Sequence, residues 1–236
     1  MNIAALPELL DDAALTRCTA LPVKPIAVTL RGRYVHLVPL QPGDHADPLF
    51  ALSNGAPARL GERTIGAYDA DALIWRFMWE GPFATLTEFK SRLTQQCAVA
   101  NALALCVLDA PTGHPVGITN FMSNSPEHLK IELGGIWYSP LVQRTHANTE
   151  ATYLQLQHAF DLGYRRVEWK CNTLNERSQR AALRLGFTFE GIQASHMIIK
   201  GRSRDTAWFR MLDHEWPAVE SHLRQLLYAA SSIAVA

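Results

Sequence analysis

The chain has 236 residues, of which 48% are hydrophobic and 19% are charged. This composition is typical of a packed globular protein and excludes a largely disordered one. Lys plus Arg number 22 and Asp plus Glu number 22, so no global basic charge exists to attract nucleic acid or an anionic membrane surface. We therefore expect neither nucleic acid nor membrane among the partners, and any anion site must be local.

The cysteines and histidines indicate neither a metal cluster nor a redox dithiol. Four cysteines form no close pair along the sequence, and nine histidines show no His-Glu-x-x-His spacing. No run approaches the roughly 20 apolar residues of a membrane span, and the first residues lack the pattern of a signal peptide. We expect reduced thiols, no bound metal and a cytoplasmic location.

The first part of the chain predicts mainly helices. Residues 1–30 contain three prolines and show weak periodicity, and we interpret them as an N-terminal arm that packs on a domain. The alternation in residues 34–40 fits a strand. Helices are expected at 45–52, 69–79 and 85–99, with an irregular stretch at 55–66 and a capping box formed by Thr85 and Glu88.

From residue 103 onward the pattern favours strands. Strands are expected at 103–108, 116–122, 131–138, 166–171, 187–190, 196–200 and 206–212, and helices at 145–162, 175–185 and 215–227. The last nine residues are interpreted as a frayed end. No internal repeat is present, so we expect one domain at 31–218, with a C-terminal helix end and tail at 219–236. This order predicts a mixed α/β sheet with one right-handed parallel crossover between residues 131 and 171.

The strand at 131–138 and the helix after it are the most informative part of the chain. The apolar positions of the strand change parity across Gly134-Gly135, and one extra residue at a β-bulge would restore a single apolar face. A short polar loop then opens the helix. The free backbone N–H groups of a helix start, with the positive end of its dipole, make a site for phosphate. The sequence therefore predicts a phosphorylated cofactor beside a strand.

The order of elements and several motifs together resemble the GNAT acetyltransferase superfamily, and more closely its RimJ/RimL-type N-acetyltransferase branch. The likeness covers about residues 31–218. Its motifs are Gly134-Gly135-Ile136-Trp137-Tyr138-Ser139-Pro140, Gln143-Arg144-Thr145, and the run Asn175, Ser178, Leu185-Gly186-Phe187 and Glu190-Gly191. The superfamily phosphate loop is Gln/Arg-x-x-Gly-x-Gly/Ala, and both of its glycines are absent here. The resemblance implies a mixed, largely antiparallel sheet flanked by helices, with a β-bulge and a splayed parallel strand pair at the cofactor site.

The resemblance also implies acetyl-CoA as the cofactor. The pantetheine arm would lie between the splayed strands, next to the main chain of Ile136, Trp137 and Tyr138, and an N–H near the bulge would polarise the acetyl carbonyl. An alternative interpretation is that Trp137 and Tyr138 belong to a buried strand with no role. The pyrophosphate is expected at the loop and helix start formed by Gln143, Arg144, Thr145, His146, Ala147, Asn148 and Thr149.

Two further positions match catalytic or cofactor positions of similar enzymes. Asn175 and Ser178 lie one helical turn apart on one face. The resemblance implies that the Asn175 amide contacts the pantetheine arm and that the Ser178 hydroxyl donates to the departing thiolate. The alternative is that Asn175 caps the helix and Ser178 is a surface hydroxyl. Glu132, two residues before the glycines, is the leading candidate for the base that takes the amine proton, and its alternative is a solvated or ion-paired carboxylate. His196 is a weaker candidate.

An aromatic and acidic cluster at residues 75–83 matches the region that walls the acceptor site in related folds. Trp79 and Phe83 could stack on a flat ring or pack an acyl chain, and Glu80 could receive a cationic amine. The alternative is ordinary core followed by a turn.

The implied reaction is transfer of an acetyl group from acetyl-CoA to a primary amine, on a small molecule or a protein N-terminus, by direct attack in a ternary complex. A non-catalytic acyl-CoA-binding regulator and an adaptor that binds a protein partner are the alternatives. The sequence does not specify an oligomeric state.

Overall fold

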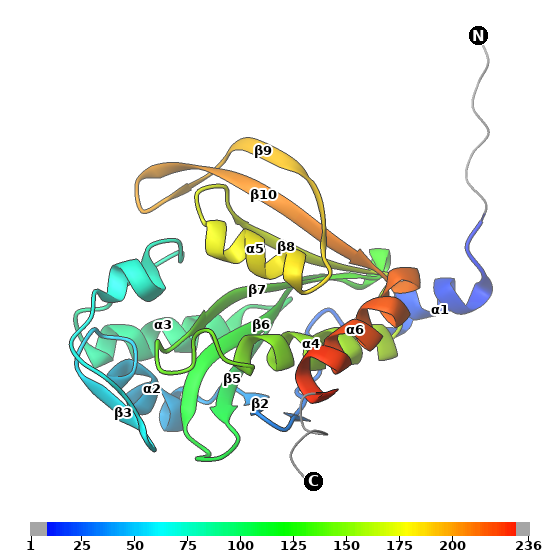
Figure 1. The fold of residues 1–236 in the computed structure, drawn as a ribbon. Coiled ribbons are helices and arrows are strands. Elements are labelled where there is room, and N and C mark those ends of the chain that lie inside the picture. The colour runs from blue at the N-terminus through cyan, green and yellow to red at the C-terminus, as the bar shows by residue number, and fades with distance from the viewer. Residues whose placement is uncertain (1–8, 230–236) are drawn as a thin grey trace, which may run out of the picture.

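The computed structural model describes residues 9–229, and they form one large mixed sheet with helices on both faces (Figure 1). Its strands are β1 (Leu30–Arg31), β2 (Val35–Pro39), β5 (Leu103–Asp109), β6 (Pro115–Ser125), β7 (Lys130–Tyr138), β8 (Arg166–Asn172), β9 (Thr188–Ile199) and β10 (Arg202–Leu212). They are paired in the order β1-β2-β5-β6-β7-β8-β10-β9, and β7 with β8 is the parallel pair of this sheet. The predicted fold class is therefore confirmed.

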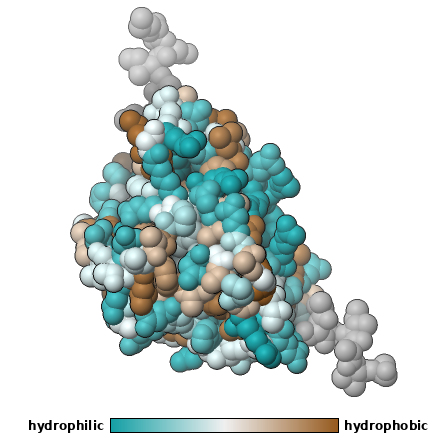
Figure 2. Space-filling view, turned by 90° about the vertical axis from the view of Figure 1, so that its left-hand side faces the viewer, coloured by the Kyte–Doolittle hydropathy of each residue, from teal (hydrophilic) through white to brown (hydrophobic). Residues whose placement is uncertain are grey.

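Helices cover the two faces of the sheet and enclose two hydrophobic cores. The helices are α1 (Asp12–Ala20), α2 (Pro42–Ala51), the π-helix η1 (Asp71–Trp75), α3 (Leu86–Ala98), α4 (Ala147–Asp161), α5 (Glu176–Arg184) and α6 (Trp216–Tyr228), with 3-10 turns η2 (Pro126–His128) and η3 (Asp213–Glu215). One core contains Leu49 of α2 and Phe89 of α3, and the other contains Leu156 of α4 and Leu223 of α6. On the face seen in Figure 2, hydrophilic and hydrophobic side chains are interspersed, without one continuous apolar area.

Local signals in the sequence explain where two helices begin. The Thr85 hydroxyl accepts a hydrogen bond from the Glu88 N–H (3.2 Å), and the Glu88 carboxylate accepts one from the Ala84 N–H (3.1 Å). This reciprocal arrangement satisfies free donors at the start of α3, much as a capping box does. At α5 the side chain of Asn175 accepts from the Ser178 N–H (3.2 Å). These caps fix the first turn of each helix.

The predicted bulge lies in β7. Ile118 of β6 is opposite Trp137, and Asn120 is opposite Gly134, so two steps along β6 face three steps along β7. Gly135 takes a positive φ of +58° there, a conformation that glycine adopts without a Cβ clash. The Asn120 side-chain amide donates to the carbonyl oxygens of Gly134 (2.8 Å) and Gly135 (3.2 Å), and thereby fixes the bulge.

The parallel pair β7–β8 separates beyond its first three residues. Lys130, Ile131 and Glu132 pair with β8, and the last partner on β8 is Glu168. β7 then continues through residues 133–138 and β8 through residues 169–172 without pairing to each other. The predicted splayed pair is therefore present, and it leaves a space between the two strands.

Four local predictions differ from the structure. The stretch 55–66 contains a small hairpin, β3 (Ala58–Leu60) and β4 (Arg63–Ile65), and the predicted helix at 69–79 is reduced to the five residues of η1. η1 stops where Trp75 turns inward to pack on Phe83 and Trp137. The two strands predicted at 187–190 and 196–200 are one strand, β9, whose side chains are mostly exposed. An edge strand of this kind carries no apolar alternation that would reveal its continuity.

The fourth difference concerns the region predicted as an N-terminal arm. It contains α1, capped by the Asp11 carboxylate, which accepts from the Ala14 N–H (2.6 Å). The segment after α1 lies on the domain, because the Asn124 side chain donates to the carbonyl oxygens of Pro22 and Val23. Residues 1–8 of this arm and residues 230–236 of the predicted frayed end lie outside the described part of the chain. The predicted domain boundaries stay predictions.

Candidate active site

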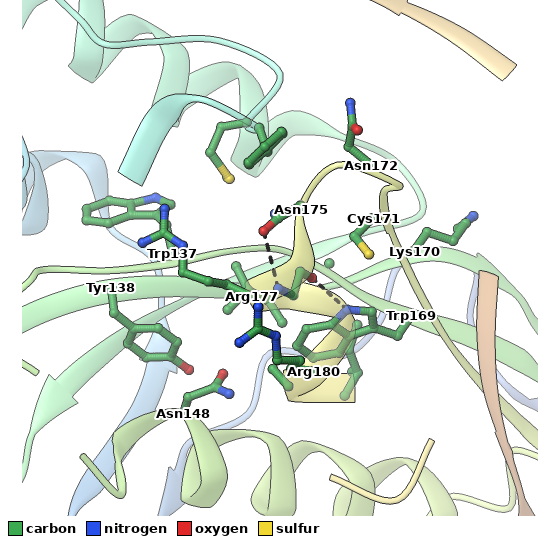
Figure 3. Close-up of a pocket in the computed structure, with 18 of the residues that line it drawn as sticks. Trp137, Tyr138, Asn148, Trp169, Lys170, Cys171, Asn172, Asn175, Arg177 and Arg180 are labelled. Atoms are coloured by element: carbon green, nitrogen blue, oxygen red, sulfur yellow. Dashed lines mark hydrogen bonds between the residues drawn. The ribbon is translucent and has the colours of Figure 1, made fainter. Parts of the chain in front are cut away.

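A groove of about 1150 Å³ lies where β7 and β8 separate. Its walls come from β7, β8, the start of α4, α5, η1 and the hairpin of β9 and β10, and Figure 3 shows side chains from several of these elements around it. The groove brings together nearly all predicted cofactor residues, namely Ile136, Trp137, Tyr138, Gln143, Arg144, Thr145, His146, Asn148, Thr149, Asn175 and Ser178. The exception is Ala147, which is buried in the core.

After the bulge, the neighbouring side chains of Trp137 and Tyr138 lie on opposite faces of the sheet. Trp137 lies on the α3 side, with its ring 5.1 Å from that of Trp75, whereas Tyr138 belongs to the core on the α4 side. Burial raises the pKa of the Tyr138 phenol. Its hydroxyl is buried, has no hydrogen-bond partner within residues 9–229, and points toward Asn148 in Figure 3. A buried hydroxyl without a partner is costly, so this group is available for a ligand in the groove.

The loop before α4 supplies a helix start with free donors. Arg144 has a φ of +63°, so an arginine adopts here the left-handed conformation that favours glycine. The Thr145 hydroxyl accepts from the Ala147 N–H (3.2 Å). Among the described residues no acceptor is present for the N–H groups of Asn148 and Thr149. Such a helix start suits an anionic group.

Gln143 is engaged in the fold of this loop. Its side-chain amide donates to the carbonyl oxygen of Tyr138 (2.9 Å) and to that of Leu73 in η1 (3.1 Å). The side chain therefore connects the end of β7 with η1. The predicted contact of Gln143 with the cofactor would therefore be made by its backbone.

The start of α5 faces the same groove. The Ser178 hydroxyl accepts from the indole Nε1–H of Trp169 (3.0 Å), as drawn in Figure 3. Ser178 is half-buried. The indole can only donate, so the hydroxyl proton of Ser178 is directed elsewhere, toward the neighbouring Cys171 sulfur, with which Ser178 also forms a hydrogen bond. The side-chain oxygen of Asn175 caps the helix, which leaves its NH₂ group for the groove.

Glu132 lies at the floor of the groove and is 6% exposed. Its carboxylate pairs with the Lys170 ammonium (2.6 Å) and accepts from the Ser123 hydroxyl (2.8 Å). The ion-paired alternative for Glu132 is therefore what the structure shows, at a position that still lines the groove. His196, the weaker candidate base, contacts the Thr206 hydroxyl through Nδ1 (3.0 Å).

The aromatic cluster forms a second cavity of about 280 Å³, which shares a wall with the groove. Trp79, Glu80 and Phe83 all line it, and Trp79 is 45% exposed. Glu80 pairs with Arg92 (3.1 Å), so its carboxylate is already engaged. Residues shared by the two cavities are Met78, Trp79, Met122, Ser123, Gly135 and Trp137.

Several groove residues were not predicted from the sequence. Arg177, Arg180 and Arg184 project from α5 toward the groove, and their spacing of three and four residues is a signal that could have revealed them. Arg184 donates to the Thr149 hydroxyl (2.8 Å), so it joins α5 to the first turn of α4. Lys170 and Arg204 come from β8 and β10. Only the sheet pairing brings these two residues to one place.

The described residues contain neither a metal-binding cluster nor a membrane-spanning helix. No group of three His, Cys, Asp or Glu side chains there could hold a metal ion. In the same residues no helix has the length and apolar character needed to cross a membrane.

Comparison with known proteins gives a consistent set of similarities. The family model described as "Acetyltransferase (GNAT) domain" matches residues 35–188. A GCN5-related N-acetyltransferase from Brucella melitensis has a similar structure, with a TM-score of 0.76 and 41% identity over 85% of this chain and 86% of its own. A probable acetyltransferase (GNAT family) from Chromobacterium violaceum gives a TM-score of 0.77 and 32% identity over 92% and 99%.

A more distant structural match concerns the predicted branch. Mycobacterium smegmatis RimJ in complex with CoA-disulfide has a TM-score of 0.63 at 18% identity, over 87% of this chain and 96% of its own. This level of similarity extends to the fold alone. No match was found among curated proteins.

Proposed function

Because this chain belongs to the GNAT acetyltransferase family, we propose that it transfers the acetyl group of acetyl-CoA to a primary amine, on a small molecule or a protein N-terminus, by direct attack in a ternary complex. The observation that carries the proposal is the gap between β7 and β8, which opens beside the free first-turn amides of α4. The RimJ/RimL-type branch and the cytoplasmic location stay predictions.

Residues of the groove fit acetyl-CoA in chemistry. When bound, acetyl-CoA supplies an acetyl group activated as a thioester. The first turn of α4 and Arg144 would hold the diphosphate, with Arg180 and Arg184 adding positive charge nearby. The main chain of residues 136–138 would pair with the amide groups of the pantetheine arm, since β7 has no strand neighbour in the gap. The free Tyr138 hydroxyl and the Asn175 NH₂ group are further donors for that arm.

The bulge and Ser178 would supply the two donors that acyl transfer needs. A bulge leaves backbone groups unpaired, and an N–H next to Gly135 is suited to stabilise negative charge on the acetyl oxygen. Ser178 would donate its hydroxyl proton, which now faces Cys171, to the leaving sulfur. Burial raises the pKa of the neighbouring Cys171 thiol, so this thiol is not a ready nucleophile and direct attack by the amine is favoured.

The acceptor amine must lose a proton when it attacks, and we assign Glu132 as the group that receives it. The carboxylate would act through a water or through Ser123, which already donates to it. Lys170 holds the carboxylate in place through their ion pair. The apolar part of the acceptor would occupy the aromatic cavity next to Trp79 and Phe83.

Two measurements test this function. Release of free thiol from acetyl-CoA with a panel of amines separates an enzyme from a non-catalytic regulator or an adaptor. Stabilisation by CoA separates a regulator from an adaptor, because a ligand that binds only the folded state raises its stability. The proposal would be overturned if the chain released no thiol from acetyl-CoA and was not stabilised by millimolar CoA.

A further inference from the structure

Arg204 is a buried cation of the groove that makes no direct ion pair within the described residues. It is 7% exposed and lines the groove. Within residues 9–229 its guanidinium makes one hydrogen bond, from Nε to the Thr206 hydroxyl (3.1 Å), and no carboxylate lies within ion-pair distance. Burial lowers the pKa of Arg204, but an arginine remains charged at neutral pH.

The acidic groups near Arg204 are already paired with other cations. Glu132 pairs with Lys170 (2.6 Å), and Glu168 pairs with Arg166 (2.8 Å). Glu132 still acts on Arg204 electrostatically, but no described carboxylate contacts the Arg204 guanidinium, whose Nη groups have no hydrogen-bond acceptor among residues 9–229. A buried guanidinium with unfilled hydrogen-bond positions is costly, so its presence in a groove points to a ligand that fills them.

The sheet pairing puts Arg204 on the acceptor side of the groove. Trp208 lies opposite Lys170 on β8, and side chains two and four residues away on one strand share its face. Arg204 and Lys170 therefore lie on the same face. Trp169, which holds Ser178 on α5, lies on the other face, because neighbouring residues of a strand alternate. Arg204 is thus on the face where Lys170 pairs with Glu132, the carboxylate that we assign to receive the amine proton.

We propose that Arg204 binds an anionic oxygen group of the acceptor, a carboxylate or a phosphate, so that the substrate carries both an amine and an oxyanion. The inference rests on the proposed function and specifies its substrate class. The guanidinium offers two Nη nitrogens in a planar fork, which matches the paired oxygens of either group. The aromatic cavity next to this face has Glu80 and Arg92 as its ionisable lining residues, and they pair with each other. An amino acid with a large apolar side chain is therefore the probe that uses both features.

The first experiment compares acceptors that differ in the oxyanion alone. We expect kcat/KM for L-phenylalanine to exceed that for 2-phenylethylamine by at least about 10-fold, since hydrogen bonds to charged groups contribute about 1.5–3 kcal/mol and each 1.4 kcal/mol is a factor of ten. O-phosphoethanolamine against ethanolamine distinguishes phosphate from carboxylate. Equal rates within both pairs would overturn the inference, while transfer to the neutral amines would leave the proposed function intact.

The matched variants are Arg204→Met, which removes the charge at similar length, and Arg204→Lys, which keeps the charge but not the fork. Arg204→Met should abolish the preference for L-phenylalanine without lowering the melting temperature, because it removes a buried charge that makes no direct ion pair. Arg204→Lys should retain part of the preference. If Arg204→Met showed no melting transition and Arg204→Lys kept the full preference for L-phenylalanine, the role of Arg204 would be purely structural, and the inference would be overturned.

A binding measurement keeps the test independent of turnover. N-acetyl-L-phenylalanine carries the carboxylate and no free amine, and N-acetyl-2-phenylethylamine lacks both. We expect the first compound to raise the melting temperature of the wild-type chain more than the second, and Arg204→Met to remove the difference. Equal shifts from both compounds would contradict an anion site at Arg204 whether or not the chain transfers acetyl groups.

Discussion

Replacement of Ser178 by alanine is the sharpest mutational test of the proposed chemistry. The variant removes the hydroxyl that is expected to donate to the leaving sulfur, while the Asn175 cap remains because it binds the Ser178 backbone N–H. We expect turnover to fall strongly and affinity for CoA to stay within about threefold, because a group that acts on the departing thiolate contributes mainly in the transition state.

The structure sets the size of the two effects. A positioned general acid contributes about 10²–10⁴-fold to a rate, so kcat should fall by at least about 100-fold. The same variant leaves the Trp169 Nε1–H, which now donates to Ser178 over 3.0 Å, without its acceptor. A buried donor left unsatisfied costs about 1–3 kcal/mol, so some loss of stability is also expected.

The matched control is Trp169→Phe, which removes the indole N–H and keeps the Ser178 hydroxyl. Both variants break the same hydrogen bond, but Ser178→Ala alone removes the proton donor. Thiol release from acetyl-CoA, calorimetric titration with CoA and thermal unfolding should be measured on both. The reasoning is refuted if the two variants lose turnover equally, since the loss would then follow from the broken hydrogen bond, or if Ser178→Ala turns over at the wild-type rate.

Three further predictions concern the loop, the bulge and the carboxylate. Arg144→Gly should stabilise the chain by about 1 kcal/mol, as measured by chemical denaturation, because it relieves the left-handed backbone conformation of an arginine (φ +63°). The same variant should bind CoA about tenfold more weakly, because it loses a charged donor. Tighter CoA binding would contradict this prediction. Gly135→Ala should destabilise by about 2 kcal/mol or more, because the new Cβ would lie 2.6 Å from the Asn120 side-chain nitrogen, and normal stability would be inconsistent with the bulge. Glu132→Gln should lower kcat by about 100-fold, with Lys170→Met as the control that keeps the carboxylate. An unchanged kcat in Glu132→Gln would remove Glu132 from the scheme.

The sequence was sufficient where a local pattern has one physical explanation. The change of apolar parity across Gly134-Gly135 requires an extra residue, and the structure has a bulge there. Thr85 and Asn175 precede helices and cap them. The fold class followed from the order of such elements together with a family resemblance.

Sequence reasoning failed where residues distant along the chain determine the outcome. Glu132 was predicted as a free base or an ion-paired residue, and the choice depends on Lys170, which strand pairing brings to 2.6 Å. The sequence did not indicate the burial of Arg204, because this burial depends on how β10 lies against β8. The π-helix η1 is equally non-local, since side chains of Gln143, Arg177 and Lys200 bind its carbonyl oxygens at Leu73, Ala72 and Trp75.

A crystal structure with bound CoA tests the central claim most directly. The account predicts that the pantetheine arm lies between β7 and β8, with the diphosphate at residues 143–149 and the sulfur within hydrogen-bond distance of the Ser178 hydroxyl. CoA bound elsewhere on the chain, or β7 and β8 paired along residues 133–138 with no space between them, would contradict it.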